Sequence, residues 1–158
     1  IIFNIGNRPA HWGDMPKKLG YLDLMHVASW QISFKRESIV NNNVYFDEHM
    51  GAGSGNGAEE EFRFLTDCRK NGLAIYYVPF VIADVAQTKS TWFKGYNEEF
   101  FINRGNTTRY IMGYVPAVLY AAYYSIRKRH QFDSDISWFK AFRLIMKGIH
   151  ENRLGKKK

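Results

Sequence analysis

The chain has 158 residues, a length that suits one domain and can bury a substantial core. Aromatic residues make up 16% of it, which argues against disorder, and the single cysteine, Cys68, excludes an internal disulfide and fits a reducing compartment. The formal net charge is +7, with most of the excess late in the chain, which predicts attraction to an anionic surface, either nucleic acid or acidic lipid headgroups. A solvated, solubilising tail is the alternative interpretation.

Short elements are predicted in the N-terminal part of the chain. Residues 1–5 are apolar and predict a strand, and residues 7–20, rich in proline and glycine, predict a loop. Residues 29–37 (SWQISFKRE) alternate apolar and polar side chains with the period of a strand. Residues 37–50 predict a short helix and an irregular lead into the glycine-rich segment 51–57. Because the chain lacks an initiator Met and opens inside a strand-like run, we expect it to be a piece of a longer protein.

A helix is predicted over residues 59–71, followed by an Asn-Gly end signal. On a wheel of 100° per residue, three side chains share one face: Phe64, Leu65 and Cys68. Glu61 falls in the middle of that face and Glu60 at its edge, whereas Glu59 points to solvent with Arg63 and Lys70.

Two interpretations of the three glutamates follow from this placement. A carboxylate on the core-facing side of a first turn is costly to bury unless something there interacts with it. The helix N-terminus can keep such a group ionised. Such a group beside a flexible glycine loop is a candidate general base. The alternative is that residues 59–61 are ordinary first-turn acids that stabilise the helix dipole.

The C-terminal part is predicted to be mainly helical. Residues 73–79 and 80–85 predict two strands, the first ended by its proline, and residues 86–109 predict a binding loop or a partly helical segment. Residues 110–126 carry no charge, but a helix of that length spans about 25 Å, which is short of a bilayer core, so a buried or interfacial helix is expected. Residues 138–149 have the pattern of a basic amphipathic helix.

The ordered motifs resemble the C-terminal half of the catalytic domain of family 2 glycosyltransferases, which have the α/β GT-A fold. The matching positions are Phe46, Asp47, Glu48, the glycine loop 51–57, Glu60, Glu61, Gly72, Ile75, Tyr77 and Pro79. The likeness is greatest to bacterial surface-polysaccharide transferases, where it includes STWFKGYNEEFF and the basic tail. It implies an acceptor-side half-domain over residues 1–109 and a basic amphipathic helical tail over residues 110–158. This tail could associate with a membrane.

The resemblance implies inverting transfer of a sugar from a nucleotide-sugar donor to a saccharide or lipid-linked acceptor. The family's base lies eleven positions before the helix-ending glycine, which here is Glu61, and Glu60 would orient the acceptor or the loop. The implied location is cytoplasmic, with peripheral association at the inner face of the membrane.

Three departures from the family pattern narrow these expectations. The nucleotide-binding half with its Asp-x-Asp motif is missing, so the ligands of a divalent cation (Mg or Mn) would lie mostly outside this chain. The strand that contains Pro79 is not followed by the family's metal-binding histidine, and we assign no metal ligand in this chain. No Gln-x-x-Arg-Trp motif is present, which favours addition of a single sugar over processive synthesis.

Five further residues are candidates for substrate binding. Trp30 and Asp47 could line the acceptor site, Gly55 and Gly57 could give the acceptor room, and Trp92 could stack on a sugar. For Trp30 and Asp47 a place in the core or a capping role is the alternative, and Trp92 could belong to a surface loop that docks its aromatics on the core.

Two functions without chemistry compete with the transferase. The chain could be a basic binding module for a membrane surface or a nucleic acid, although it has no recognisable RNA-binding signature, so a nucleic acid is the less expected partner. It could also be a folded remnant that does no chemistry. Half a sheet leaves an open edge, and we therefore expect association into a homodimer.

Overall fold

The computed structural model describes residues 1–7, 12–51, 54, 59–86, 93 and 95–157. The chain forms two compact units. The sheet unit contains Ile1–Asp47 and Glu59–Lys89, and the helical unit contains Glu48–Ala58 and Ser90–Lys158. Together they make a mixed α/β protein in which the strands belong to one unit and the three longest helices to the other.

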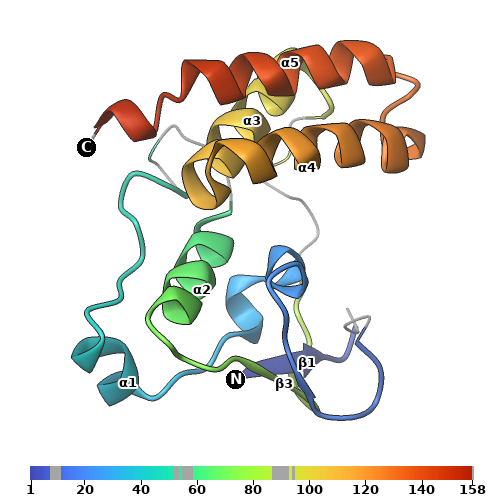
Figure 1. Ribbon diagram of the computed structural model, residues 1–158. Coiled ribbons are helices and arrows are strands. Elements are labelled where there is room, and N and C mark those ends of the chain that lie inside the picture. The colour runs from blue at the N-terminus through green and yellow to red at the C-terminus, as the bar shows by residue number, and fades with distance from the viewer. Residues whose placement is uncertain (8–11, 52–53, 55–58, 87–92, 94, 158) are drawn as a thin grey trace. The chain divides into compact units, whose positions relative to one another are not determined.

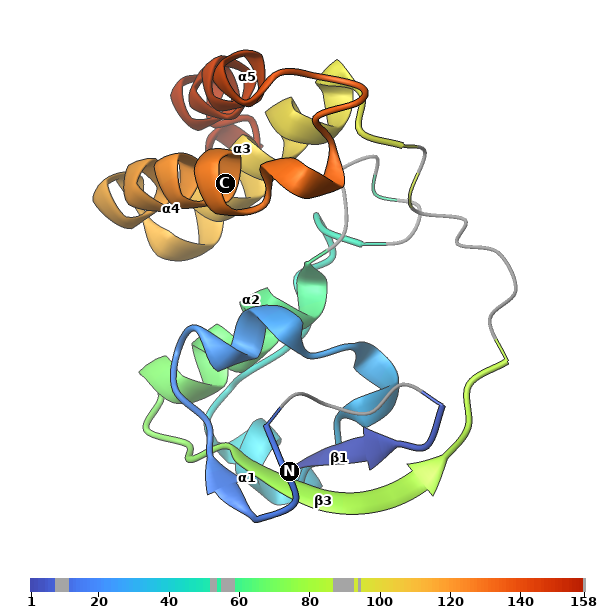
Figure 2. The ribbon, with the colours of Figure 1, turned by 90° about the vertical axis from the view of Figure 1, so that its right-hand side faces the viewer.

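The sheet has the strand order β1-β3-β2, and Figures 1 and 2 label the neighbouring strands β1 and β3. The strands are β1 (Ile2–Ile5), β2 (Lys17–Lys18) and β3 (Tyr76–Ala83), with β1 parallel and β2 antiparallel to β3. The predicted strand at residues 1–5 is confirmed. The predicted loop at residues 7–20 contains the two residues of β2.

Strand β3 passes through Pro79, so the prediction of two strands separated at that proline was wrong. The pairing register of β1 and β3 shifts between Phe3, which faces Val78, and Asn4, which faces Val81. Pro79 lies in the residues that this irregularity leaves unpaired, and a proline is tolerated there because it has no N–H to donate to the ladder.

The predicted strand at residues 29–37 was also wrong. Ser29–Gln31 form a 3₁₀ turn, η2, and the short helix α1 begins at Arg36 and ends at Asn41. The Gln31 side chain accepts a hydrogen bond from the Ala28 N–H (3.0 Å) and donates one to the Phe3 carbonyl (3.2 Å), which stabilises the turn. In this segment Ile32 makes an isolated bridge to Ile2.

Helix α2 (Glu60–Lys70) confirms the predicted helix to within a residue at each end. Its core side buries Phe64, Leu65 and Cys68 as expected, and also Phe62 and Thr66. The 3₁₀ turn η1 (Asp23–His26) packs against it. Gly72 follows with φ +79°, the left-handed conformation that an Asn-Gly helix end predicts.

The helical unit contains α3 (Glu98–Met112), α4 (Tyr114–Arg127) and α5 (Trp138–Glu151). It also contains the short 3₁₀ turns η3 (Arg129–Gln131) and η4 (Gly155–Lys157). Gly113 separates α3 from α4 with φ +87°, so the uncharged segment expected as one helix is shared between two. The boundary predicted after residue 109 falls inside α3, which packs against α4 and α5.

Helices α3 and α5 cross backbone against backbone (Figure 1). A Cβ added at Gly105 would collide with the Ile145 carbonyl, and one added at Gly148 would collide with the Ile102 carbonyl. Two glycines therefore permit the closest approach in this core.

Aromatic packing completes the core of the helical unit. Phe101 and Phe132 are fully buried edge to face, with ring centroids 5.0 Å apart. The Arg104 guanidinium lies over the rings of Phe100 and Tyr124, at 4.9 and 4.6 Å from their centroids.

Candidate functional site

The first turn of α2 carries the predicted acidic pair. Glu59 is the N-cap residue and has φ +89° and ψ 18°, a left-handed conformation that is strained for a residue with a Cβ. Glu60 and Glu61 follow in the first turn and are both half-buried. The N-terminal end of the helix macrodipole favours carboxylates at these positions.

Glu60 differs from its neighbours in how one oxygen is placed. Its Oε2 atom is buried and, within the described part of the chain, has no hydrogen-bond partner. Burial raises the pKa of the Glu60 carboxyl above its ordinary value, and the charges of Glu61 and Glu59 raise it further, against a hydrogen bond from its own backbone. A carboxylate with a raised pKa is a stronger proton acceptor than an exposed one, which is the property that a general base requires.

The wheel placed Glu61 at the centre of the core-facing side and Glu60 at its edge. The structure instead leaves both half-buried and gives the buried, unpartnered oxygen to Glu60. Glu59 and Arg63 were expected in solvent but are also half-buried. Arg63 is held close to the helix because its Nε donates to Asp67 Oδ2 at 2.7 Å.

A partly exposed aromatic surface lies beside the same helix. The Phe46 ring stacks on the Phe64 ring with centroids 4.2 Å apart and an interplanar angle of 3°, and the Phe34 ring lies 5.6 Å from Phe64. Phe34 and Phe46 are both exposed. The predicted site residue Asp47 adjoins Phe46 in the chain and is half-buried, so this stacking brings it to the side of α2.

The other predicted binding residues have different positions. Trp30 lies on η2, which packs against β1, and its side chain is exposed. Gly55, Gly57 and Trp92 lie outside the described residues. Gly51 belongs to the helical unit and has φ +84°, and its carbonyl accepts hydrogen bonds from the Ser54 N–H and Oγ.

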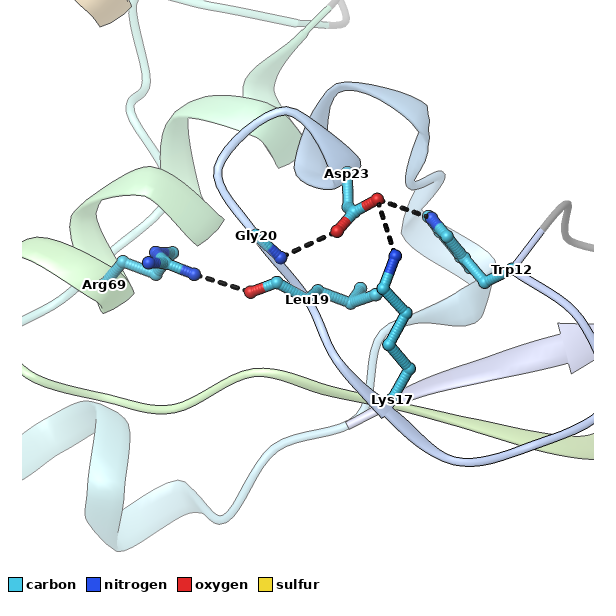
Figure 3. Close-up of polar contacts among 6 residues, drawn as sticks. All are labelled: Trp12, Lys17, Leu19, Gly20, Asp23 and Arg69. Carbon is cyan, nitrogen blue, oxygen red and sulfur yellow. Dashed lines mark hydrogen bonds and ion pairs between the residues drawn. The ribbon is translucent and has the colours of Figure 1, made fainter.

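Asp23 organises a polar network that the sequence did not reveal (Figure 3). Its Oδ2 accepts from the Gly20 N–H at 2.7 Å, and its Oδ1 accepts from Trp12 Nε1 at 3.1 Å and Lys17 Nζ at 3.3 Å. Burial alone would raise the pKa of Asp23, but these donors outweigh it and lower the pKa below its usual range. Asp23 therefore stays ionised and acts as a structural acceptor rather than as a base.

The Asp23 network is tied to both α2 and the sheet. Arg69 near the end of α2 donates to the Leu19 carbonyl (Figure 3), and the Leu19 N–H donates to the Ile75 carbonyl at 2.9 Å. Three donors converging on one aspartate from residues 12, 17 and 20 have no sequence signature. The network therefore could not have been predicted, although it fixes the loop that packs next to α2.

The described residues show neither a reactive thiol nor a metal centre. Cys68 is buried, and burial together with the Asp67 charge raises the pKa of its thiol to about 11, so the thiolate is scarce at neutral pH and Cys68 is a poor nucleophile. In the described ranges, no three His, Cys, Asp or Glu side chains are grouped so that they could hold a metal ion.

No described helix is long and apolar enough to cross a membrane. Comparison with protein-family models, curated proteins and solved structures found no match to this chain.

Proposed function

We propose that the protein is a glycosyltransferase resembling family 2, which transfers a sugar with inversion from a nucleotide-sugar donor to a saccharide or lipid-linked acceptor. The observation that carries this proposal is the Glu60–Glu61 pair on the first turn of α2, with a buried, unpartnered Glu60 oxygen in the described structure. The order of motifs around the pair supports it from the sequence side.

In the proposed reaction, a carboxylate of the pair takes the proton from an acceptor hydroxyl. The acceptor oxygen then forms a bond to the anomeric carbon while the bond from that carbon to the nucleoside diphosphate breaks, and the diphosphate leaves with the electron pair. Attack opposite the leaving group inverts the configuration. The exposed rings of Phe34 and Phe46 offer an apolar surface on which the acceptor sugar could rest.

The motif position and the pKa point to different members of the pair as the base. The motif position assigns it to Glu61, with Glu60 orienting the acceptor. The raised pKa favours Glu60. The divalent cation implied by the resemblance would have its ligands mostly outside this chain, and the described residues contain no group of three His, Cys, Asp or Glu side chains that could hold a metal ion, so the proposed reaction assigns no step to a metal.

The test is release of nucleoside diphosphate by the full-length protein, supplied with a panel of nucleotide sugars and a lipid extract as acceptor. We expect one donor to be turned over, and Gln at the base to lower kcat by about a hundredfold or more. Glu60→Gln and Glu61→Gln, measured separately, identify the base. Glu37→Gln, in the first turn of α1, is the matched control and should leave kcat unchanged. Failure of every donor, or full activity in both variants, would overturn the proposal.

A further inference from the structure

Helix α4 presents an apolar stripe on its outer face. The stripe consists of Val115, Leu119, Tyr123 and Ile126, whose exposed fractions lie between 52% and 68%. Their spacing of four, four and three residues places them on one side of the helix. The opposite side of α4 buries Ala117, Ala121 and Tyr124 in the core of the helical unit. The exposure is therefore organised along the helix.

The stripe is long and contains no charge. From Val115 to Ile126 it covers about 17 Å of helix, and no charged residue occurs between residues 110 and 126. Apolar side chains scattered singly over a surface need no explanation, but a continuous apolar face marks an interaction site.

The positive charge of the protein belongs to the same unit as this stripe. The helical unit has 13 lysines and arginines against 6 acidic residues, a net charge of +7, whereas the sheet unit has 9 of each and is neutral. Arg127 and Arg129 are exposed at the end of α4. Trp138 and Phe139 are exposed at the start of α5, which lies at the same end of the helical unit (Figure 1).

Apart from Trp138 and Phe139 at its start, helix α5 supplies no apolar docking face. It is the amphipathic helix expected from the sequence, but its apolar side, with Ala141, Ile145 and Ile149, is buried in the core shared with α3 and α4. Its exposed side carries Arg143 together with Lys140, which pairs with Glu98 at 2.6 Å, and Lys147, which lies 4.0 Å from Glu151. Within the helical unit, α4 therefore offers the apolar surface and α5 contributes positive charge.

We propose that the outer face of α4 docks on an anionic lipid bilayer, with the helix lying in the plane of the interface. The stripe would enter the boundary between headgroups and acyl chains, Arg127 and Arg129 would contact acidic headgroups, and Trp138 would lie at the polar boundary that tryptophan prefers. The proposal does not depend on the transferase activity, and lipid binding can be measured without any donor.

Charge decides between a bilayer and other occupants. A second copy of the helical unit also has a net charge of +7, which opposes its approach to the first. A nucleic acid would satisfy the basic residues but leave the apolar stripe against phosphates. An anionic bilayer complements both the charge and the apolar stripe.

The experiment is flotation of the full chain with vesicles of phosphatidylcholine, either alone or with about 30% phosphatidylglycerol. We expect binding to the anionic vesicles, weaker in about 0.5 M than in about 0.1 M salt. The double variant Leu119→Gln with Ile126→Gln should lower the affinity by at least about tenfold.

The matched control replaces two equally exposed apolar residues of the sheet unit. Leu22 is 68% exposed, like Leu119, and Val81 is 51% exposed, close to the 55% of Ile126. Leu22→Gln with Val81→Gln should leave vesicle binding unchanged. Circular dichroism checks that both double variants keep their helix content.

A second variant tests the charge without touching the stripe. Arg127→Gln with Arg129→Gln should weaken binding to anionic vesicles by about tenfold or more. Three results would overturn the proposal: no binding to anionic vesicles, an equal loss in the control pair, or a dimer in light scattering that Leu119→Gln with Ile126→Gln dissociates.

Discussion

The sheet unit and the helical unit are held together by different kinds of contact. The sheet unit joins short elements with side-chain hydrogen bonds, of which the Asp23 network is the densest described. The helical unit stacks three long helices through backbone contact and aromatic packing. The first arrangement places polar side chains near the surface. The second consists mainly of buried backbone and aromatic contacts, which make the unit rigid. We therefore expect chemistry in the sheet unit and attachment in the helical unit.

The largest loss of stability should come from adding a side chain where α3 and α5 cross. Alanine in a helix is ordinarily better than glycine by up to about 1 kcal/mol, but at Gly105 its Cβ would meet the Ile145 carbonyl, which cannot move without its helix. We expect Gly105→Ala to lower the free energy of unfolding by about 3 kcal/mol. Urea titration followed by circular dichroism measures this.

The control for that substitution is Gly20→Ala in the sheet unit. Its nearest new contact would be Asp23 Oδ2 at 3.4 Å, so the change should stay within about 0.5 kcal/mol. A Gly105→Ala protein as stable as the parent would show that α3 and α5 are not in backbone contact, and the contrast between the two units would fail.

A middle-sized effect is expected from Asp23→Ala. The substitution removes an ionised acceptor from three donors, which should lower the free energy of unfolding by about 1–2 kcal/mol at pH 7. Because the pKa of Asp23 is lower in the folded state, its stabilisation is present above the ordinary value of 3.8 and is lost as pH falls through the folded value. Unfolding curves of parent and variant should converge below that pH; a constant difference would contradict the assignment.

The smallest effect is expected from Glu60→Gln, and it has the opposite sign. The pKa of Glu60 is raised in the folded state, so this group stabilises the fold below its ordinary pKa of 4.5, and that contribution is lost as pH rises through the folded value. At pH 7 Gln should therefore raise stability, by less than about 1 kcal/mol because solvent screens a half-exposed charge. Thermal unfolding at pH 7 and pH 4 measures it; a destabilised variant at pH 7 would show that the ionised carboxylate has a partner.

The elements predicted well were those with a strong period and clear ends. Helix α2 combines an apolar face with an Asn-Gly end, and α5 has apolar residues on one side of twelve consecutive positions. Helix α3 also has a start signal in the sequence, because Asn97 precedes two glutamates and its side chain accepts from the Phe100 N–H.

The wrong predictions have a common physical cause. Residues 29–37 have the alternation of a strand, but Gln31 stabilises a turn by bonding to Ala28 and Phe3, and such tertiary bonds override a local period. A proline breaks a strand only where the ladder needs an N–H at its position, and the irregular pairing with β1 removes that need at Pro79.

The candidate site could be located from the sequence but not resolved. The first turn of α2 was predicted. The helical wheel does not determine which of its carboxylates is buried away from solvent, because this depends on the packing around the turn. The Asp23 network and the aromatic surface of Phe34 and Phe46 depend on segments that meet only after folding.

The glycine crossing also has a consequence for folding kinetics. Gly105 and Gly148 are about forty residues apart, so their contact forms only after the chain through α4 has closed as a loop. Both backbones must already be helical to fit, and we expect this contact to form late, after the transition state. Substitutions there should therefore accelerate unfolding far more than they slow folding, and the crossing would determine how long the helical unit stays folded once formed.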